Sequence, residues 1–225
     1  MTFVTVFLGA GGGAGTSSSA LAAARRLAGR VLLLDLDVWS GTLAAQVGLD
    51  PTVSLADLAA VELADIDGDA IAAVSWRVDG GLELIPAPSR PELADVIDPQ
   101  LVEAVFELII AGNQYDAIVV DAGSRLDLTT WHACMRADRL VICSRRSTDA
   151  RVRVGNLLDV LSRSHCAAQV EHRRSRTFAS YQLAQLTRWA RRNLLVRQSS
   201  RPGAGAAARG TLPIGSPASS SMRGG

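Results

Sequence analysis

Apolar and polar residues follow one another along residues 1–163 in a pattern that predicts alternating strands and helices. Short apolar, β-branched stretches predict buried strands, and amphipathic stretches between them predict helices. Such alternation is typical of a mostly parallel central sheet with helices on both faces, a three-layer α/β sandwich. Strands are expected at 2–8, 31–37, 82–87, 115–123 and 137–144, and helices at about 17–27, 54–64, 67–75, 99–111 and 148–163.

Acidic residues and a glycine-rich loop come at the ends of these expected strands. The loop GAGGGAGTSS (9–18) follows the first strand, Asp35 and Asp37 end the second, and Asp121 lies near the end of the fourth. Right-handed crossovers bring the carboxyl ends of parallel strands to one edge of a sheet, where ligands bind. We therefore expect the loop and the three aspartates to form one site.

The loop has the composition of an anion-binding turn. Glycines allow successive backbone N–H groups to point at one anion, and the following helix adds the positive end of its dipole. Ser17 stands where a hydroxyl binds Mg²⁺, and Asp121, after the apolar run AIVV, has the setting of a carboxylate that holds Mg²⁺ through water. The alternative is that Asp37 and Asp121 cap the turns after them. The expected phosphate-binding residues are Gly11, Gly12, Gly13, Ala14, Gly15, Thr16, Ser17 and Ser18.

Charge is distributed unevenly along the chain. All 23 basic residues are arginine, so no lysine is available to contact a phosphate. Residues 1–171 carry 13 arginines and 22 acidic residues, a net charge of −9, whereas residues 172–225 carry 10 arginines and no acid. This shift predicts a nucleotide-binding domain at 1–171 and a basic, low-complexity, disordered tail at 172–225. Within the tail, 178–197 has apolar spacing typical of an amphipathic helix.

Other features bear on the location of the protein. No run of 18 uncharged apolar residues is present, and the N-terminus lacks the basic start of a signal peptide. The three cysteines have neither an even count nor metal-ligand spacing. We expect a cytoplasmic protein with reduced cysteines. Its tail is suited to weak contact with nucleic acid or with anionic lipids, which would make it peripheral at the inner face of the membrane.

The loop and the segments after it resemble the ParA/MinD superfamily of P-loop ATPases. The deviant Walker A loop of that family reads K-G-G-x-G-K-[ST]. Gly12, Gly13, Gly15 and Ser17 match it, whereas Gly11 and Thr16 stand at its two lysines. LLLDLDVWSGTLAAQVGLDPTVSLADL (32–58) resembles the second motif and switch region of the family. LELIPAPSRPELADVIDPQLVEAV (82–105) is similar, more narrowly, to the bacterial CpaE/TadZ branch. The resemblance covers about residues 2–163.

The resemblance implies ATP or ADP as ligand, with Mg²⁺ held by Ser17 and Asp121, and a homodimer. It implies that Asp37 positions or activates the water that attacks ATP. In the family, one lysine contacts the β- and γ-phosphates and the other reaches a partner's nucleotide. Both are absent here, so we expect slow or absent hydrolysis, and whether the chain is an ATPase stays open. Arg125 and Arg145 are candidates for the missing charge, but the sequence does not place them.

Three functions are consistent with these residues. The first is a CpaE/TadZ-like ATP-binding protein that positions pilus or secretion assembly, or the septum in cell division, with polar or septal assembly proteins as partners. The second is a non-catalytic scaffold whose nucleotide site is vestigial, and the third is a chromosome-partitioning-type, DNA-associated protein. The family's further strand has only a weak counterpart in CAAQVEHRR (166–174), so we expect a sheet truncated at its C-terminal edge. The acid-free tail is also what a GC-rich gene yields when read out of frame.

Overall fold

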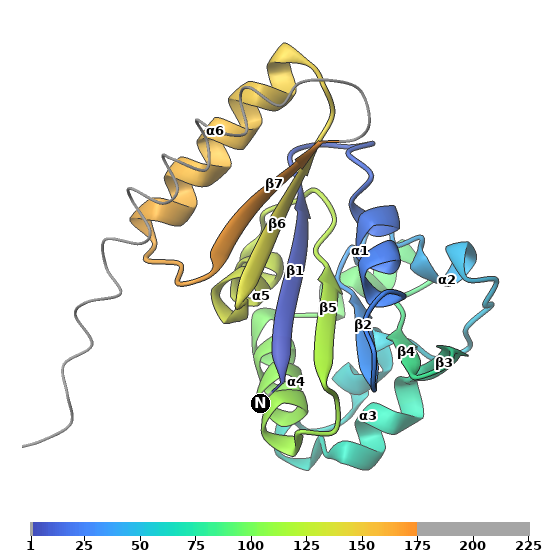
Figure 1. Cartoon of the computed structure of the whole chain (residues 1–225). Helices are drawn as coiled ribbons and strands as arrows, with labels where there is room; N and C mark the ends of the chain where they lie inside the picture. The colour runs from blue at the N-terminus through green and yellow to red at the C-terminus, as the bar shows by residue number, and fades with distance from the viewer. Residues whose placement is uncertain (1, 175–225) are drawn as a thin grey trace, which may run out of the picture.

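The computed structural model describes residues 2–174, which form a seven-stranded sheet with helices on both faces (Figure 1). The strands lie in the order β3-β4-β2-β5-β1-β6-β7, and only β3 runs antiparallel to its neighbour. The predicted mostly parallel α/β sandwich is therefore confirmed. The strands are β1 (Phe3–Gly9), β2 (Val31–Asp35), β3 (Trp76–Asp79), β4 (Leu82–Ile85), β5 (Ala117–Asp121), β6 (Arg139–Ser144) and β7 (Gln169–Arg174).

The helices divide between the two faces of the sheet. Buried residues of α1 and α2 pack on one face, and those of α3, α4, α5 and α6 pack on the other. The α-helices are α1 (Thr16–Ala24), α2 (Leu43–Gln46), α3 (Gly68–Val74), α4 (Pro99–Gly112), α5 (Leu128–Arg136) and α6 (Thr148–Arg163). The described residues also form three 3₁₀ helices: η1 (Leu55–Ala60), η2 (Leu63–Asp65) and η3 (Pro91–Val96).

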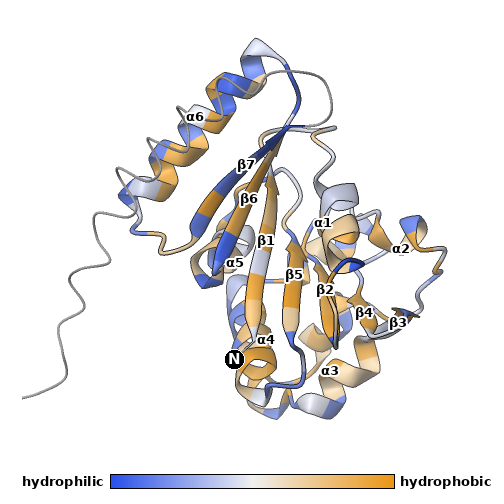
Figure 2. Cartoon of the chain, viewed as in Figure 1, coloured by the Kyte–Doolittle hydropathy of each residue, from blue (hydrophilic) through white to orange (hydrophobic). Residues whose placement is uncertain are grey.

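The central strands β1, β2 and β5 are mostly apolar because both of their faces are covered. In β1, Val6 and Leu8 belong to the core under α4, α5 and α6, whereas Phe7 belongs to the core under α1. Strand side chains alternate between faces, so a strand covered on both sides carries apolar residues in succession rather than in alternation. Figure 2 shows this as largely hydrophobic colour in β1, β2 and β5, with a paler stretch in the middle of β1.

The register of these strands brings the expected site residues to one edge. Asp121 pairs with Phe7 of β1 and with Asp35 of β2, and Gly9 pairs with Cys143 of β6. The loop after β1 and the start of α6 lie at this same end of the sheet (Figure 1). The edge predicted from the sequence is thus the edge where the loop and the aspartates meet.

Strand β7 corrects the expectation of a sheet truncated after β6. It runs parallel to β6 in continuous register, from Arg139 opposite Gln169 to Ser144 opposite Arg174. Only His172 of its six residues is buried, and the strand is largely hydrophilic (Figure 2). An edge strand of this kind carries little apolar signal, which is why the sequence pattern does not predict it.

The boundary drawn at residue 171 falls inside β7, which continues to Arg174. The expected tail with its helix at 178–197 lies outside the described residues. Within residues 2–174, no helix is long and apolar enough to cross a bilayer. The three cysteines, Cys134, Cys143 and Cys166, are buried and form no disulfide with one another.

Several further elements differ from the sequence expectation, and α2, β3 and η3 have no counterpart in it. The segment predicted as a helix at 54–64 forms the 3₁₀ helices η1 and η2 instead. Helix α5 was not predicted, because its buried face consists of small or polar residues. It begins at Asp127, whose side chain accepts the Thr130 N–H at 2.9 Å while the Thr130 hydroxyl accepts the Asp127 N–H at 3.0 Å. This reciprocal cap defines the helix start. The buried residues of α5 are Thr129, Thr130, Ala133 and Cys134.

Candidate functional site

The loop between β1 and α1 presents a row of unpaired backbone N–H groups. Its base is fixed by two hydrogen bonds, from the Gly9 N–H to the Gly123 carbonyl and from the Ala10 N–H to the Cys143 carbonyl, both 2.7 Å long. Gly11, Gly13 and Gly15 then adopt positive φ angles of 127°, 69° and 76°, which glycine adopts without strain. Within residues 2–174, the N–H groups of 11–18 have no hydrogen-bond acceptor, and no side chain caps α1.

Unpaired N–H groups at the start of a helix bind anions well, because the helix dipole adds positive potential there. The loop therefore has the geometry of a phosphate cradle. Its residues Gly11 to Ser18 were all expected to take part, and the structure brings them together at the carboxyl edge of the sheet.

Asp121 and Ser17 lie beside each other below this loop. Asp121 is fully buried, and its Oδ1 accepts the Gly123 N–H at 3.1 Å. Its Oδ2 is buried and has no hydrogen-bond partner among the described residues. Burial raises the pKa of Asp121 to about 6, a rise that Asp37 increases and that the Ser17 hydroxyl and the Gly123 N–H oppose. The two residues expected to bind magnesium are thus adjacent, with one carboxylate oxygen unused.

Two more carboxylates lie close to Asp121. Asp35, 1% exposed, accepts the N–H groups of Asp37 at 3.1 Å and of Leu43 at 3.3 Å. Burial, and then the charge of Asp121, raises the pKa of Asp35 well above its usual value. Asp35 therefore holds the turn that leads into α2, a structural role that the sequence did not reveal.

Asp37, the residue expected to act on water, is half-buried on the switch segment. Its Oδ1 accepts the Ser40 hydroxyl at 2.9 Å. A Cβ placed on Gly123 would come within 2.5 Å of its Cγ, so only a glycine fits beside it there. Asp37 thus lies against the chain that follows Asp121. Three carboxylates at one edge repel each other, and this repulsion favours a bound cation.

The residues at this edge fit a magnesium ion. In nucleotide sites Mg²⁺ takes one or two protein oxygens and completes its shell with water and phosphate oxygens. The unused Oδ2 of Asp121 and the neighbouring Ser17 hydroxyl are oxygens of this kind. Within the described residues no group of three or more His, Cys, Asp or Glu side chains gathers as a metal site.

Thr16 and Ser18 do not replace the lysine that the family pattern has at position 16. Thr16 is 7% exposed, and a Cβ on Gly9 would lie 2.6 Å from its Oγ1, so its hydroxyl lies against the base of the loop. The Ser18 hydroxyl is exposed and donates to Oε1 of Gln46 at 3.3 Å. Neither side chain brings positive charge to the cradle.

Arginines lie near the loop in an arrangement that the sequence reveals only in part. Of the two candidates, Arg125 is stacked on Trp39, 4.8 Å from the ring centroid, whereas Arg145 lies beside Gly13. A third, Arg153 of α6, lies against Gly11 and was not anticipated. Its position depends on β6 pairing with β1, because this pairing brings the start of α6 to the loop. No local sequence motif indicates that α6 lies next to this loop.

Comparison with solved structures shows which class of protein has this fold. A ParA family ATPase from Chlorobium tepidum matches with 22% identity and a TM-score of 0.67, over 83% of this chain and 80% of that chain. A plasmid partition protein from Borrelia burgdorferi matches with 18% identity and a TM-score of 0.65, over 84% and 87%. The septum site-determining protein MinD from Pyrococcus horikoshii, complexed with Mg-ADP, matches with 19% identity and a TM-score of 0.60, over 76% and 69%.

These comparisons define the chain as an α/β protein with the fold of the ParA/MinD ATPases. The resemblance found in the sequence is therefore confirmed at the level of the fold. No protein-family model and no curated protein matches the sequence.

Proposed function

We propose that this protein binds ATP or ADP with Mg²⁺ at the β1–α1 loop. The observation that carries the proposal is the buried Oδ2 of Asp121, which has no partner in the described chain and lies beside Ser17. A buried carboxylate oxygen without a partner is costly, and a magnesium ion would relieve that cost. The row of unpaired N–H groups at 11–18 supplies the anion-binding half of the same site. The fold is also that of a MinD protein solved with Mg-ADP.

Nucleotide binding, rather than rapid hydrolysis, is the proposed activity. A lost charge-assisted contact removes about 1.5–3 kcal/mol of binding, and the charge that develops in phosphoryl transfer loses a counter-ion. Gly11 and Thr16 carry no charge, and Thr16 is buried. When bound, Mg²⁺ would neutralise phosphate charge and orient the β- and γ-phosphates. Asp37, against Gly123 and on the segment between β2 and α2, is the residue proposed to hold the attacking water.

The cellular role that we propose is spatial positioning of an assembly machine. Solved proteins with this fold include a plasmid partition protein and a septum site-determining protein. The segment 82–105, which resembles the CpaE/TadZ branch, forms β4, η3 and the first half of α4. The Pro86 carbonyl accepts the Leu55 N–H at 3.0 Å, which ties this segment to η1 in the switch-like region. We propose that nucleotide binding changes the assembly state of a homodimer, and so its affinity for polar or septal proteins.

A scaffold with a vestigial nucleotide site is the second candidate. It is favoured by the neutral residues at positions 11 and 16 and by the absence of lysine from the chain. The partition-type, DNA-associated role depends on the basic tail, which lies outside the described residues.

Calorimetric titration of the full chain with ATP and with ADP, each with and without Mg²⁺, tests the proposal. We expect binding that requires Mg²⁺ in the wild type and that loses this requirement in Asp121→Asn. Asp159→Asn is the matched control, since Asp159 is an exposed aspartate paired with Arg163 on α6. Ser17→Ala should weaken binding in the presence of Mg²⁺, with Ser162→Ala as its control. Tight binding that is independent of the metal would refute the roles of Ser17 and Asp121, and absent binding would favour the scaffold.

A further inference from the structure

Two arginines from the segment after β6 lie over the phosphate loop. Arg145 follows β6 directly, and Arg153 stands in the second turn of α6. Because β6 pairs with β1, with Cys143 opposite Gly9, this segment leaves the sheet next to the loop.

Arg153 fills the space that a side chain at position 11 would enter. A Cβ placed on Gly11 would lie 2.7 Å from Nη1 of Arg153 and 3.6 Å from its Cδ and Cζ. Position 11 is where the family pattern has its signature lysine. The guanidinium of Arg153 thus reaches this place from another element of the chain.

Arg145 lies next to the following turn of the loop. A Cβ on Gly13 would be 3.8 Å from Cδ and from Nη1 of Arg145. Both arginines are exposed. Within residues 2–174 neither forms an ion pair or a hydrogen bond with another side chain.

The loop and the arginines are both hydrogen-bond donors. The N–H groups of 11–18 have no acceptor in the described chain, and a guanidinium carries five N–H donors and no acceptor. Neither side can therefore satisfy the other. A multivalent anion between them would satisfy both at once, and guanidinium groups bind phosphate oxygens in pairs.

We propose that Arg145 and Arg153 close over the phosphate chain of the bound nucleotide and supply the charge that Gly11 and Thr16 lack. This inference rests on the proposed function, because it assumes a ligand in the loop. The unpartnered Oδ2 of Asp121, buried beside Ser17 at the first turn of α1, is an independent sign that this loop holds a ligand. The ligand class is a nucleoside diphosphate or triphosphate.

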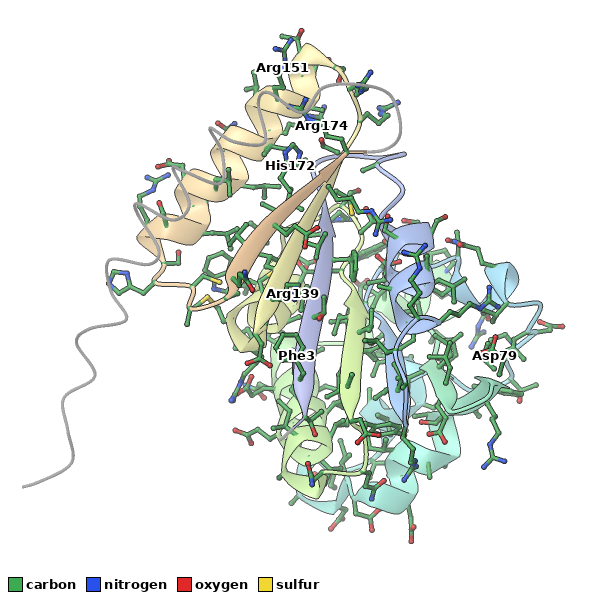
Figure 3. The ribbon with its side chains drawn as sticks, viewed as in Figure 1. Phe3, Asp79, Arg139, Arg151, His172 and Arg174 are labelled. Atoms are coloured by element: carbon green, nitrogen blue, oxygen red, sulfur yellow. The ribbon has the colours of Figure 1, made fainter. Side chains whose placement is uncertain are left out.

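The position of Arg153 is fixed by the packing of α6. The helix begins at Ser147, whose hydroxyl accepts the Ala150 N–H at 3.2 Å. Val154 and Leu158 are buried against the sheet, which sets the rotation of the helix. Arg151 is two residues from Arg153, more than half a turn around the helix. Its Nη2 donates a hydrogen bond to the Thr148 hydroxyl at 3.3 Å, at the start of α6 (Figure 3). Arg151 therefore serves as the matched control.

The test uses the full chain and measures the affinity of Mg-ATP and of inorganic tripolyphosphate. The variants are Arg145→Ala, Arg153→Ala, Arg153→Lys and the control Arg151→Ala, each checked for an unchanged thermal melt. We expect Arg145→Ala and Arg153→Ala each to lower the binding affinity for both ligands about tenfold or more. Arg153→Lys should retain part of the affinity, because it keeps the charge and loses the paired contact. Arg151→Ala should stay within about twofold of the wild type, which is the scale of a screened surface charge.

The outcomes separate this inference from the proposed function. If the wild type binds Mg-ATP, and Arg145→Ala and Arg153→Ala bind it with the same affinity as Arg151→Ala, the inference is overturned. The proposed function would then still stand. A loss confined to one arginine would assign the phosphates to that residue and overturn the role of the other. If the protein binds tripolyphosphate but not Mg-ATP, the result would support phosphate binding by the arginines. It would overturn the proposal that the ligand is a nucleotide. Absence of binding for both ligands would overturn both proposals.

Discussion

Acid should destabilise this protein through His172, the one fully inward-facing residue of β7. His172 is 8% exposed, and its Nε2 lies 2.8 Å from the Ser144 hydroxyl, while its Nδ1 is buried without a partner among the described residues. Burial, followed by the charge of Arg174, lowers the pKa of His172 from 6.5 to about 4. Protonation would place a positive charge in the layer between β7 and α6, with Arg174 on the same strand.

The sign follows from proton binding. Between pH 6.5 and 4 the unfolded chain binds more protons at this residue than the folded chain, so the free energy of unfolding rises with pH. The contribution is fully present above pH 6.5 and is lost as the pH falls toward 4. The full shift corresponds to about 3 kcal/mol, and solvent near the sheet edge reduces the expected loss to about 2 kcal/mol.

Urea unfolding of the wild type and of His172→Gln at pH 7.5, 5.5 and 4.5 measures this term. The difference between the two proteins cancels the titration of shared carboxylates. We expect the wild type to lose about 2 kcal/mol more than the variant over this range. His132→Gln, on α5, removes a histidine away from β7 and is the matched control. An NMR titration of the His172 ring checks the same group directly. A pKa near 6.5 would show that His172 is solvated in solution, and would refute the packing of β7 described here.

Three further predictions concern the site and its boundary. Thr16→Lys should raise ATP turnover, and Asp37→Ala in that background should abolish the gain; turnover unchanged in both would exclude the proposed role of Asp37. Gly123→Ala should destabilise the fold by about 1–3 kcal/mol in urea unfolding, because Gly123 has φ +59° and a Cβ there would meet Asp37 at 2.5 Å. A chain that ends at Arg174 should have the same melting temperature as the full chain and should lose retention on heparin at low salt. A chain that ends at residue 171 should melt at a lower temperature. Equal melting temperatures of the two truncations would show that residues 172–174 add nothing to stability.

The central sheet could be predicted from sequence because burial on both faces leaves an unambiguous pattern. Runs such as VLLL at 31–34 have no polar interruption, and α6 was predicted with its observed bounds, 148–163. The site edge follows from the same pattern, because Asp35 and Asp121 close adjacent buried strands. Topology rules then require their carboxylates to meet.

What could not be predicted depends on contacts between distant segments. Strand β7 pairs with β6 through backbone groups, and a parallel ladder of this kind needs little apolar side-chain surface at an edge. Helix α5 is defined by the Asp127–Thr130 cap and by small or polar buried residues, with Trp131 partly packed against the core. Both elements are specified by their neighbours more than by their own sequence.

Arg153 shows the same limit at the site itself, where it changes the chemical interpretation. A motif reading compares position 11 with a lysine and finds the charge missing. In the fold, the space beside Gly11 already contains a guanidinium from 142 residues further along the chain. A lysine at position 11 would have to displace Arg153. Glycine at position 11 therefore leaves the space that the Arg153 side chain occupies. The loop has N–H donors without acceptors, which favour a bound anion. Asp121 has a carboxylate oxygen without a partner, which favours a bound cation. A polyphosphate with its magnesium ion is a ligand that supplies both.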